Sequence, residues 1–296
     1  MLKKGEIISI LGENGSGKST LLNIIAGLLQ SDSGAVVLNK EKIKGPAEKL
    51  IPGHAQIKMV FQAFNLAHNL SVFENIYALL PPIKEEQKLS KTRKILRQFK
   101  LKGLEEKKVE KLSGGEKQRL SMARAFASLP EVLLFDEAFS NVDSILQEAL
   151  KKLVFGAIQR EKISALFVTH DFRDALRYSD RILIMKAGKV VAMGTPEKMY
   201  QSPKNSYCAK LTGPVNLIPG NFLNRSTTKI LFVRPEHILL REKGKKHHQA
   251  VVVNVFFVGS LYEIYVFWES AGLSLKAYSS IKYRIGEELS LDFCLS

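Results

Sequence analysis

Short apolar runs alternate with helical stretches from residue 7 to about residue 211. The runs contain four or five residues each and are rich in Ile, Val, Leu and Phe. We expect β-strands at residues 7–11, 35–38, 57–61, 132–135, 165–168 and 181–185. This alternation is typical of an α/β fold, in which helices pack on a mostly parallel sheet. Residues 70–127 are mainly helical in character and predict a helical lobe inserted into that fold.

The pattern changes after Gly213 and Pro214. The following sequence is rich in β-branched and aromatic residues, with Gly, Ser and charged residues at the predicted turns. We expect strands at residues 231–233, 250–258, 261–268, 273–278 and 288–293. A small all-β barrel of the OB type explains them most simply. The chain therefore divides into an α/β domain over residues 1–212, with its lobe at about 70–127, and a β domain over residues 213–296.

Composition favours a soluble globular protein. The 296 residues are 45% hydrophobic and 25% charged, which suits two domains with sizeable cores. No apolar run approaches the roughly 18 residues that span a bilayer, and the apolar stretch near the N-terminus is too short for a signal peptide. Cys208 and Cys294 fit neither a metal site nor a disulfide framework. We expect a cytoplasmic protein.

The formal net charge of +15 raises the question of an anionic partner. Residues 84–111 alone hold eleven Lys or Arg against five Glu. Leu89, Leu96 and Phe99 follow helical spacing there, which favours an amphipathic helix with a solvated basic face. No aromatic residues interleave with the basic ones as stacking on bases requires, so we do not expect a nucleic-acid partner.

Residues 12–20 read GENGSGKST and lie between a predicted strand and a predicted helix. This is the phosphate-loop pattern, in which glycines allow backbone N–H groups to surround a phosphate at a helix N-terminus. Lys18 would reach the β- and γ-phosphates, Ser19 would offer its hydroxyl to Mg²⁺, and Thr20 would lie near the α-phosphate. The alternative is a glycine-rich turn that caps a helix.

Two acidic residues end a predicted buried strand. Residues 132–137 read VLLFDE, and in open α/β sheets the carboxyl end of a strand is where ligands bind. Asp136 is suited to hold Mg²⁺, and Glu137 is suited to polarise an attacking water. The pair could instead cap a helix.

His170 and Gln62 also follow predicted strands. His170 is a candidate sensor of the γ-phosphate, donating a hydrogen bond where negative charge develops. The amide of Gln62 could contact both Mg²⁺ and the attacking water. Each residue taken alone could equally be structural, an ordered histidine in one case and a polar loop residue in the other.

Residues 112–119 read LSGGEKQR and form a second glycine-containing start to a helix. One phosphate site needs only one such helix start. The second is explained if it completes the site of another subunit.

Taken together, these segments resemble the nucleotide-binding subunit of an ABC transporter. The matching segments, in order over residues 5–200, are Walker A (12–20), the Q-loop (Gln62), the signature (112–119), Walker B (132–137), the D-loop (140–143) and the H-loop (169–171). The resemblance implies a head-to-tail dimer that holds two molecules of Mg-ATP between its chains. In such a dimer, ATP binding closes the interface and hydrolysis reopens it, which drives a separate permease.

The resemblance also implies the roles of individual residues. The nucleotide-binding residues would be Gly12, Asn14, Gly15, Ser16, Gly17, Lys18, Ser19 and Thr20 of one chain with Ser113, Gly114, Gly115 and Asp143. The catalytic residues would be Lys18, Gln62, Glu137 and His170, and Mg²⁺ would be held by Ser19, Gln62 and Asp136. The permease would dock on residues 64–75.

The C-terminal part is similar to importers that carry an accessory β domain called TOBE. Its junction and barrel are similar to residues 194–197 with Tyr200 and Pro203, to residues 213–216 and to residues 232–237, and the segment VRPE at 233–236 is the most specific. Such importers carry ferric iron, polyamines, sulfate, molybdate or sugars. The resemblance implies a peripheral subunit on the cytoplasmic face of the inner membrane, with an extracytoplasmic solute-binding protein in the full system. An OB-like barrel with another ligand is the alternative.

One departure from the family concerns the adenine base. Family members usually begin some twenty or more residues earlier, with a strand that carries an aromatic residue stacking on adenine, whereas no Phe, Tyr or Trp precedes Phe61 here. We expect a start further upstream; the alternative is nucleotide binding that is weakened or supplied differently. Two other functions stay open at this stage, a soluble ABC ATPase acting on nucleic acid or the ribosome and a non-hydrolysing regulatory subunit.

Overall fold

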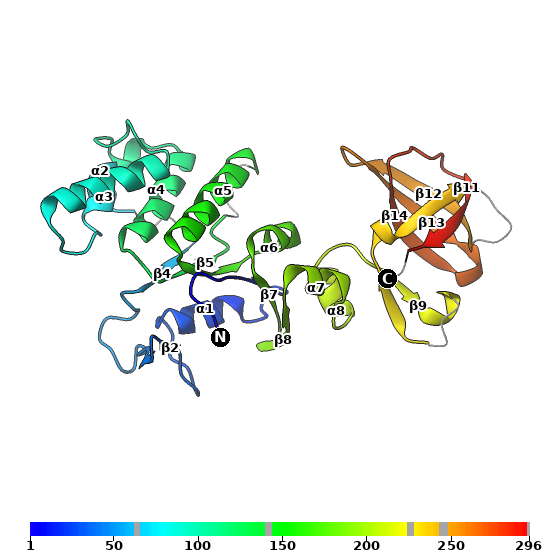
Figure 1. Ribbon diagram of the computed structural model, residues 1–296, viewed down its shortest axis with the longest axis horizontal. Helices are drawn as coiled ribbons and strands as arrows, with labels where there is room; N and C mark the ends of the chain where they lie inside the picture. The colour runs from blue at the N-terminus through cyan, green and yellow to red at the C-terminus, as the bar shows by residue number, and fades with distance from the viewer. Residues whose placement is uncertain (62–65, 140–143, 224–227, 243–247, 295–296) are drawn as a thin grey trace. The chain divides into compact units, whose positions relative to one another are not determined.

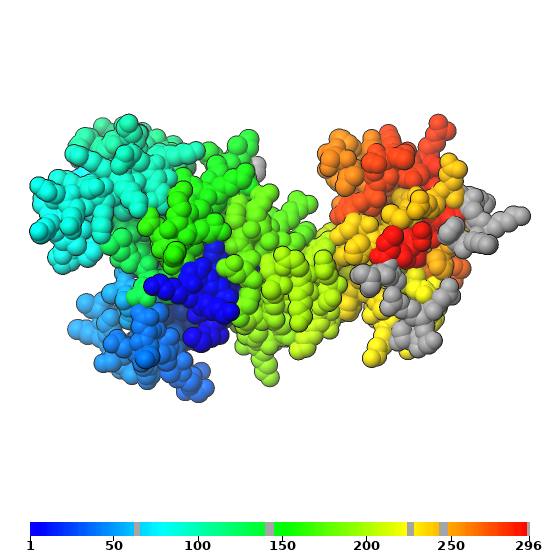
Figure 2. Space-filling model, viewed as in Figure 1, coloured from blue at the N-terminus to red at the C-terminus, as the bar shows by residue number. Residues whose placement is uncertain are grey.

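The computed structural model describes residues 1–61, 66–139, 144–223, 228–242 and 248–294 (Figure 1). The chain forms two compact units, Met1–Pro196 and Glu197–Ser296. In the space-filling view of Figure 2, the cyan side chains of the helical lobe lie at the surface of the first unit. Each unit has a hydrophobic core of its own.

The first unit is built on a mixed sheet. Its strands are β1 (Ile7–Leu11), β4 (Ile57–Val60), β5 (Val132–Asp136), β6 (Ser164–Val168), β7 (Arg181–Lys186) and β8 (Lys189–Gly194). Their order in the sheet is β4-β5-β6-β1-β7-β8, and every pair is parallel except β7 with β8. The predicted α/β class is confirmed, and most predicted strand ends lie within a residue of the observed ones.

Three features of this unit differ from the prediction. Strand β8 was not predicted; it follows β7 through a tight turn in which Ala187 and Gly188 have φ values of 46° and 75°. The strand expected at 35–38 is reduced to β2 (Val37–Leu38), which pairs with the short β3 (Glu41–Lys42). Both β2 residues keep substantial exposure, so little burial holds a longer strand there.

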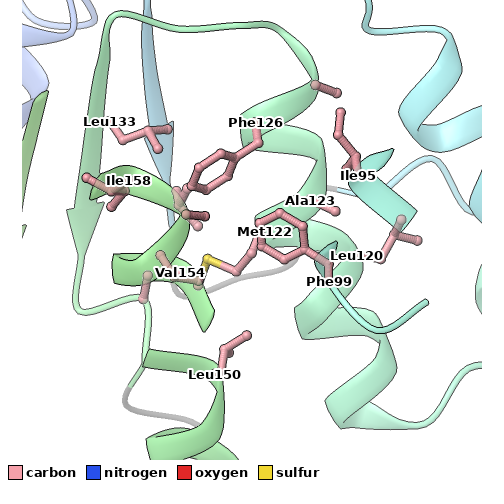
Figure 3. Close-up of a cluster of buried hydrophobic side chains, with 14 of the residues drawn as sticks. Ile95, Phe99, Leu120, Met122, Ala123, Phe126, Leu133, Leu150, Val154 and Ile158 are labelled. Atoms are coloured by element: carbon pink, nitrogen blue, oxygen red, sulfur yellow. The ribbon is translucent and has the colours of Figure 1, made fainter. Parts of the chain in front are cut away.

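The two faces of the sheet carry different helices. Along β5, Leu133 and Phe135 point into one core and Leu134 into the other, as the alternation of strand side chains requires. The core of Leu134 includes Leu22 of α1 (Lys18–Ile25). The core of Leu133, shown in Figure 3, is completed by α5 (Ser144–Glu161) and by the helical lobe.

The helical lobe consists of α2 (Val72–Tyr77), α3 (Glu85–Gln98), a 3₁₀ turn (Val109–Lys111) and α4 (Gly114–Ala127). Leu96 and Phe99 are buried in the core of Figure 3 as predicted, whereas Leu89 is only half-buried. Arg93, Lys94 and Arg97 of α3 are exposed, whereas Lys88 and Lys91 are half-buried. The last helix of the unit is α6 (Phe172–Tyr178), which follows β6.

The second unit begins with α7 (Pro196–Gln201) and α8 (Ser206–Leu211) and continues as antiparallel β structure. Strand β9 (Asn216–Pro219) pairs with β10 (Ile230–Val233). A second sheet has the order β11-β15-β12-β13-β14, from β11 (Ile238–Glu242), β12 (His248–Phe257), β13 (Tyr262–Trp268), β14 (Leu273–Ser279) and β15 (Glu288–Phe293). The predicted β character is confirmed, but β9 and β11 were not predicted. Short 3₁₀ turns lie at Gly220–Leu223, Pro235–His237 and Glu269–Ala271.

A buried arginine links α7 and α8 to the β structure through hydrogen bonds. Arg234 is 2% exposed, and its Nη1 donates to the carbonyl oxygens of Ala209 and Gly213 over 3.1 and 3.0 Å. Its Nη2 donates to the carbonyl oxygen of Tyr200 over 2.7 Å, and its guanidinium lies 4.0 Å from the centre of that ring. These contacts explain why residues 197–212 group with the β structure. The domain boundary at residue 213 stays a prediction.

Candidate active site

The phosphate loop connects β1 to α1, so β1 delivers it to the carboxyl edge of the sheet. Gly15 and Gly17 have φ values of 76° and 94°, the left-handed region that favours glycine, and Gly17 is the N-cap of α1. A Cβ atom on Gly12 would lie 2.6 Å from the carbonyl oxygen of Met185. The backbone conformation therefore favours glycine at positions 15 and 17. Position 12 needs glycine because the loop passes close to β7 there.

Lys18 folds back over this loop. Its side chain is 5% exposed, and its Nζ donates to the carbonyl oxygens of Gly12 and Glu13, each over 2.9 Å. Burial lowers the pKa of Lys18, while the negative charges of Glu137 and Asp136 oppose that shift. The ammonium group is thus held above the loop, with carboxylates close enough to affect its charge.

The remaining polar side chains of the loop differ in exposure. Asn14, Ser19 and Thr20 are exposed, whereas Ser16 is buried. Ser16 Oγ has no hydrogen-bond partner among the described residues. An unpaired buried hydroxyl beside glycine backbone is suited to an added acceptor such as a phosphate oxygen.

Ser19 and Asp136 meet across the sheet edge. The Ser19 hydroxyl donates to Asp136 Oδ1 over 3.0 Å. Asp136 ends β5 and lies opposite Val168 of β6, the strand between β5 and β1. A hydroxyl beside a carboxylate is a pair of hard oxygen donors, the kind that Mg²⁺ prefers.

Glu137 and His170 also meet at this edge. Glu137 Oε1 lies 2.6 Å from His170 Nε2, and both side chains are partly exposed. The Glu137 backbone has a φ of 50°, which is uncommon for a residue with a side chain and directs it away from the line of β5. The arrangement lets a carboxylate, oriented by its direct contact with an imidazole, polarise a water molecule.

The predicted signature segment begins α4. Ser113 is the N-cap, and its hydroxyl accepts from the Glu116 backbone N–H over 3.3 Å while Glu116 accepts from the Ser113 backbone N–H over 2.7 Å. Ser113 and Gly114 are exposed and Gly115 is half-buried. Within the described part of the chain, none of the hydrogen bonds of these three residues reaches the phosphate loop. The N-cap and the first residue of α4 are thus open to solvent.

Several predicted residues cannot be placed. Gln62, Asp143 and the first two residues of the predicted permease-docking segment lie outside the described residues. Further along that segment, Ser71, Phe73 and Glu74 border an open pocket of about 610 Å³. Asn75 is fully buried and bonds to the backbone of Ala67, so it shapes the segment from within.

The structure adds residues that no sequence motif indicated. A cavity of about 290 Å³ next to Glu137 and His170 is lined by Gln147 and Lys151 of α5 and by Asp174 of α6. One signal was available in the sequence: Lys151 falls on the apolar face of α5, three and four residues before Val154 and Phe155. A charge at such a position implies a buried partner.

Comparison with known families gives two matches along the chain. The family model described as ABC transporter matches residues 1–140, and the model described as TOBE domain matches residues 231–294. A protein of Photobacterium profundum, named Fe(3+) ions import ATP-binding protein FbpC, is 33% identical over 94% of this chain and 85% of its own length. Its namesake in Escherichia coli O157:H7 is 30% identical over 98% of this chain and 88% of its own length.

This chain belongs to the ATP-binding subunits of ABC transporters. It is an ABC-type ATPase of the importer class, as predicted, and this class works with permease partners and as dimers. Many solved structures share its fold, among them the following two. The cbiO1 protein of Clostridium perfringens, part of the ABC transporter complex cbiONQ, covers 67% of this chain and 80% of its own with a TM-score of 0.59 and 27% identity.

The second solved structure is a dimeric ATP-binding cassette, MJ0796, in a post-hydrolysis state bound to ADP and Pi. It covers 66% of this chain and 87% of its own, with a TM-score of 0.56 and 30% identity.

None of the helices in the described part of this ABC subunit has the length and apolar character needed to cross a membrane. Relatedness to importer ATP-binding subunits implies association with a membrane.

Proposed function

We propose that this subunit hydrolyses Mg-ATP to power a ferric-iron importer, as a head-to-tail dimer on the cytoplasmic face of the membrane. The observation that carries the catalytic part is the pairing of Ser19 with Asp136 and of Glu137 with His170 at one sheet edge, over 3.0 and 2.6 Å. The iron assignment is supported by relatives named for Fe(3+) import that align over 94% or more of this chain, the β unit included.

The residues at the sheet edge divide the chemical work between them. Lys18 neutralises the β- and γ-phosphates, since its ammonium already lies over the loop. Glu137 accepts the proton of the attacking water, and His170 orients Glu137 and donates toward the γ-phosphate. Gln62 is proposed to contact the same water and the metal.

The oxygen donors of Ser19 and Asp136 fit Mg²⁺, which would share its remaining positions with phosphates, Gln62 and water. The metal supplies charge neutralisation and orientation of the phosphates. Within the described residues there is no group of three His, Cys, Asp or Glu side chains that could hold a metal alone. Because the protein supplies few donors, we expect Mg²⁺ to bind together with a nucleotide, whose phosphates would supply further ligands.

The exposed start of α4 supports a shared site. Among the described residues, Ser113, Gly114 and Gly115 make no bond to the phosphate loop of their own chain, and they present backbone N–H groups at a helix N-terminus. We place these residues and Asp143 against the nucleotide of the second chain. The pocket beside Ser71 and Phe73 is the proposed seat of the permease, and an extracytoplasmic protein would deliver the iron.

The Glu137→Gln variant tests the catalytic proposal. Removing the base should trap the ATP-bound dimer, so light scattering should show a monomer without nucleotide and a dimer with Mg-ATP. Glu131→Gln, at the other end of β5, is the matched control and should dimerise only transiently. A Glu137→Gln chain that stays monomeric at millimolar Mg-ATP contradicts the proposal.

Uptake of radiolabelled ferric iron tests the solute. Cells that carry only the Glu137→Gln subunit should lose ferric uptake, while their uptake of labelled sulfate should not change. Unchanged iron uptake together with loss of another solute would reject the iron assignment and leave the ATPase assignment standing.

A further inference from the structure

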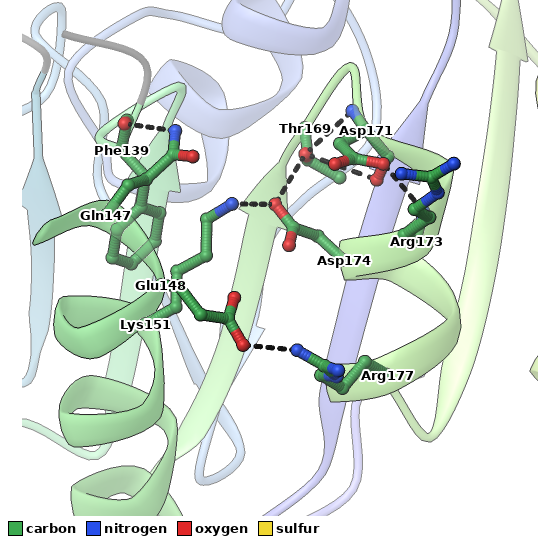
Figure 4. A network of polar contacts seen from close by, with 9 residues as sticks. All are labelled: Phe139, Gln147, Glu148, Lys151, Thr169, Asp171, Arg173, Asp174 and Arg177. Carbon is green, nitrogen blue, oxygen red and sulfur yellow. Dashed lines mark hydrogen bonds and ion pairs between the residues drawn. The ribbon is translucent and has the colours of Figure 1, made fainter. Parts of the chain in front are cut away.

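Helix α5 contacts the segments that follow both residues of the proposed catalytic pair (Figure 4). Gln147 and Lys151 lie one helical turn apart and contact different segments. The Gln147 Nε2 donates to the carbonyl oxygen of Phe139, two residues after Glu137, over 2.6 Å. The Lys151 ammonium forms an ion pair with the Asp174 carboxylate, in the helix that follows His170.

The ion pair of Lys151 and Asp174 is buried. The two residues are 5% and 8% exposed, and neither belongs to a motif of the ATP site. Burial raises the pKa of Asp174, and Lys151 opposes that shift. Since apolar residues of similar size often replace such a pair without loss of stability, a buried pair commonly fixes geometry instead.

The pair is linked to the backbone on both sides of His170. Asp174 Oδ2 accepts a long hydrogen bond, 3.5 Å, from the Thr169 hydroxyl. The Thr169 hydroxyl oxygen in turn accepts from the Asp171 backbone N–H over 3.1 Å. Residues 169 and 171 are thus tied to one polar network, and His170 lies between them.

Packing alone does not hold this segment. The cavity of about 290 Å³ opens between α5 and residues 167–171, with Phe155 and Phe167 in its wall. The His170 side chain is 47% exposed. Because one side of the segment faces a cavity and the other faces solvent, polar contacts have to define where the imidazole lies.

We propose that Lys151, assisted by Gln147, is a positioning residue that sets the contact between Glu137 and His170. Neither residue belongs to a motif of the ATP site; Lys151 acts through Asp174 and Thr169, and Gln147 acts through the Phe139 backbone. The inference rests on the proposed catalytic roles of Glu137 and His170. In this proposal, helix α5 fixes the positions of the Glu137 and His170 side chains relative to each other.

The test compares Lys151→Met, which removes the charge but keeps the length, with Lys151→Arg, which restores a charge. Lys152→Met is the matched control, because Lys152 is the next residue of α5 and its side chain is exposed. We expect Lys151→Met to lower kcat for ATP at least about tenfold while KM stays within about threefold, since the phosphate loop is untouched. Lys151→Arg should recover most of the rate, and Lys152→Met should behave like the wild type.

A second readout needs neither nucleotide nor activity. The His170 imidazole resonances of the free chain, assigned by their loss in His170→Ala, should move in Lys151→Met and not in Lys152→Met. Unmoved resonances and an unchanged kcat in a folded Lys151→Met chain overturn the proposal. If Lys151→Met does not fold, Thr169→Val removes one hydroxyl of the network, and unmoved His170 resonances in that variant overturn it equally.

The two readouts also separate this inference from the proposed function. A wild-type chain without ATPase activity would count against the proposed function alone. The resonances of His170 would still show whether Lys151 positions that side chain.

Discussion

The Ser19 hydroxyl donates to Asp136 Oδ1 over 3.0 Å, although 117 positions separate the two residues in the chain. The sheet order brings them together, because β1 and β5 flank β6 and all three strands run parallel. Their carboxyl ends therefore meet at one edge, where the phosphate loop follows β1 and the acidic pair follows β5. The contact depends on topology, with each residue supplied by a short local motif.

Asp136→Asn should show what this contact is for. The amide keeps the shape of the side chain but loses the charge that suits it to Mg²⁺, so we expect ATP hydrolysis to fall about 10–100-fold. Half-maximal activity should also require more Mg²⁺, measured by titrating the metal at fixed ATP. Asp292→Asn, in β15, is the control and should leave both values unchanged. Equal Mg²⁺ dependence in Asp136→Asn and the wild type would argue against a metal role.

The sequence predicted best where a pattern is both local and strongly buried. The run 132–135 ends in two acids, and the structure extends that strand by one residue, to Asp136. Strand β8 was not predicted because all of its residues are exposed or half-buried and do not alternate in polarity. Its place is set by the turn at Ala187 and Gly188 and by pairing with β7.

The support of the catalytic pair could not be predicted in the same way. The contact of Lys151 with Asp174 depends on how α5 packs beside α6, and neither residue lies in a motif. Likewise, Arg234 was recognised as part of a family segment, but nothing local indicates that it reaches Tyr200 and Ala209. Side-chain contacts between separate elements follow from tertiary packing, which single-sequence patterns do not encode.

Gly12→Ala should disrupt the phosphate loop, because the new Cβ would lie 2.6 Å from the Met185 carbonyl oxygen. The loop or β7 has to shift to make room, so we expect the Kd for ATP to rise at least about tenfold. Gly156→Ala, within α5, provides the contrast, since its Cβ would meet nothing within 4 Å. It should stabilise the first unit by about 0.5–1 kcal/mol through helix propensity. Calorimetric titration with ATP and chemical unfolding would measure the two effects.

The ion pair of Glu6 with Arg181 should make the first unit sensitive to acid. Arg181 donates to the two Glu6 oxygens over 2.6 and 2.8 Å. Burial by itself raises the pKa of Glu6, but the bonds from Arg181 and from the Lys3 backbone outweigh it, so the pKa lies below its usual value. A carboxyl whose pKa is lowered by folding stabilises the fold above its unfolded pKa, and that stability is lost as the pH falls through the folded pKa.

We therefore expect Glu6→Gln to be less stable than the wild type at pH 7, by about 1–2 kcal/mol, and the difference to shrink below about pH 4. Urea unfolding of the two proteins at pH 7 and at pH 3.5 would measure it. Glu41→Gln, on the exposed β3, is the control and should change stability at neither pH. A Glu6→Gln deficit that is the same at both pH values would show that packing, and not the charge, accounts for the loss.

Arg234→Met should unfold the second unit at lower denaturant. The guanidinium donates to the carbonyl oxygens of Tyr200, Ala209, Gly213 and Pro214, all within α7, α8 or the residues that follow them. Methionine fills similar volume but leaves these acceptors buried and unpaired, at a cost of about 1–3 kcal/mol for each one that water does not reach. We expect a total loss of at least about 3 kcal/mol.

Arg234→Lys separates charge from geometry in the same experiment. Lysine keeps the positive charge but cannot present the planar fork that reaches several carbonyl groups at once, so it should recover less than half of the loss. Arg241→Met, an exposed arginine of β11, should cost little. The fluorescence of Trp268, the single tryptophan and part of the second core, would follow this unit alone. Full recovery by lysine would mean that charge and the Tyr200 ring suffice, and that the carbonyl contacts contribute little.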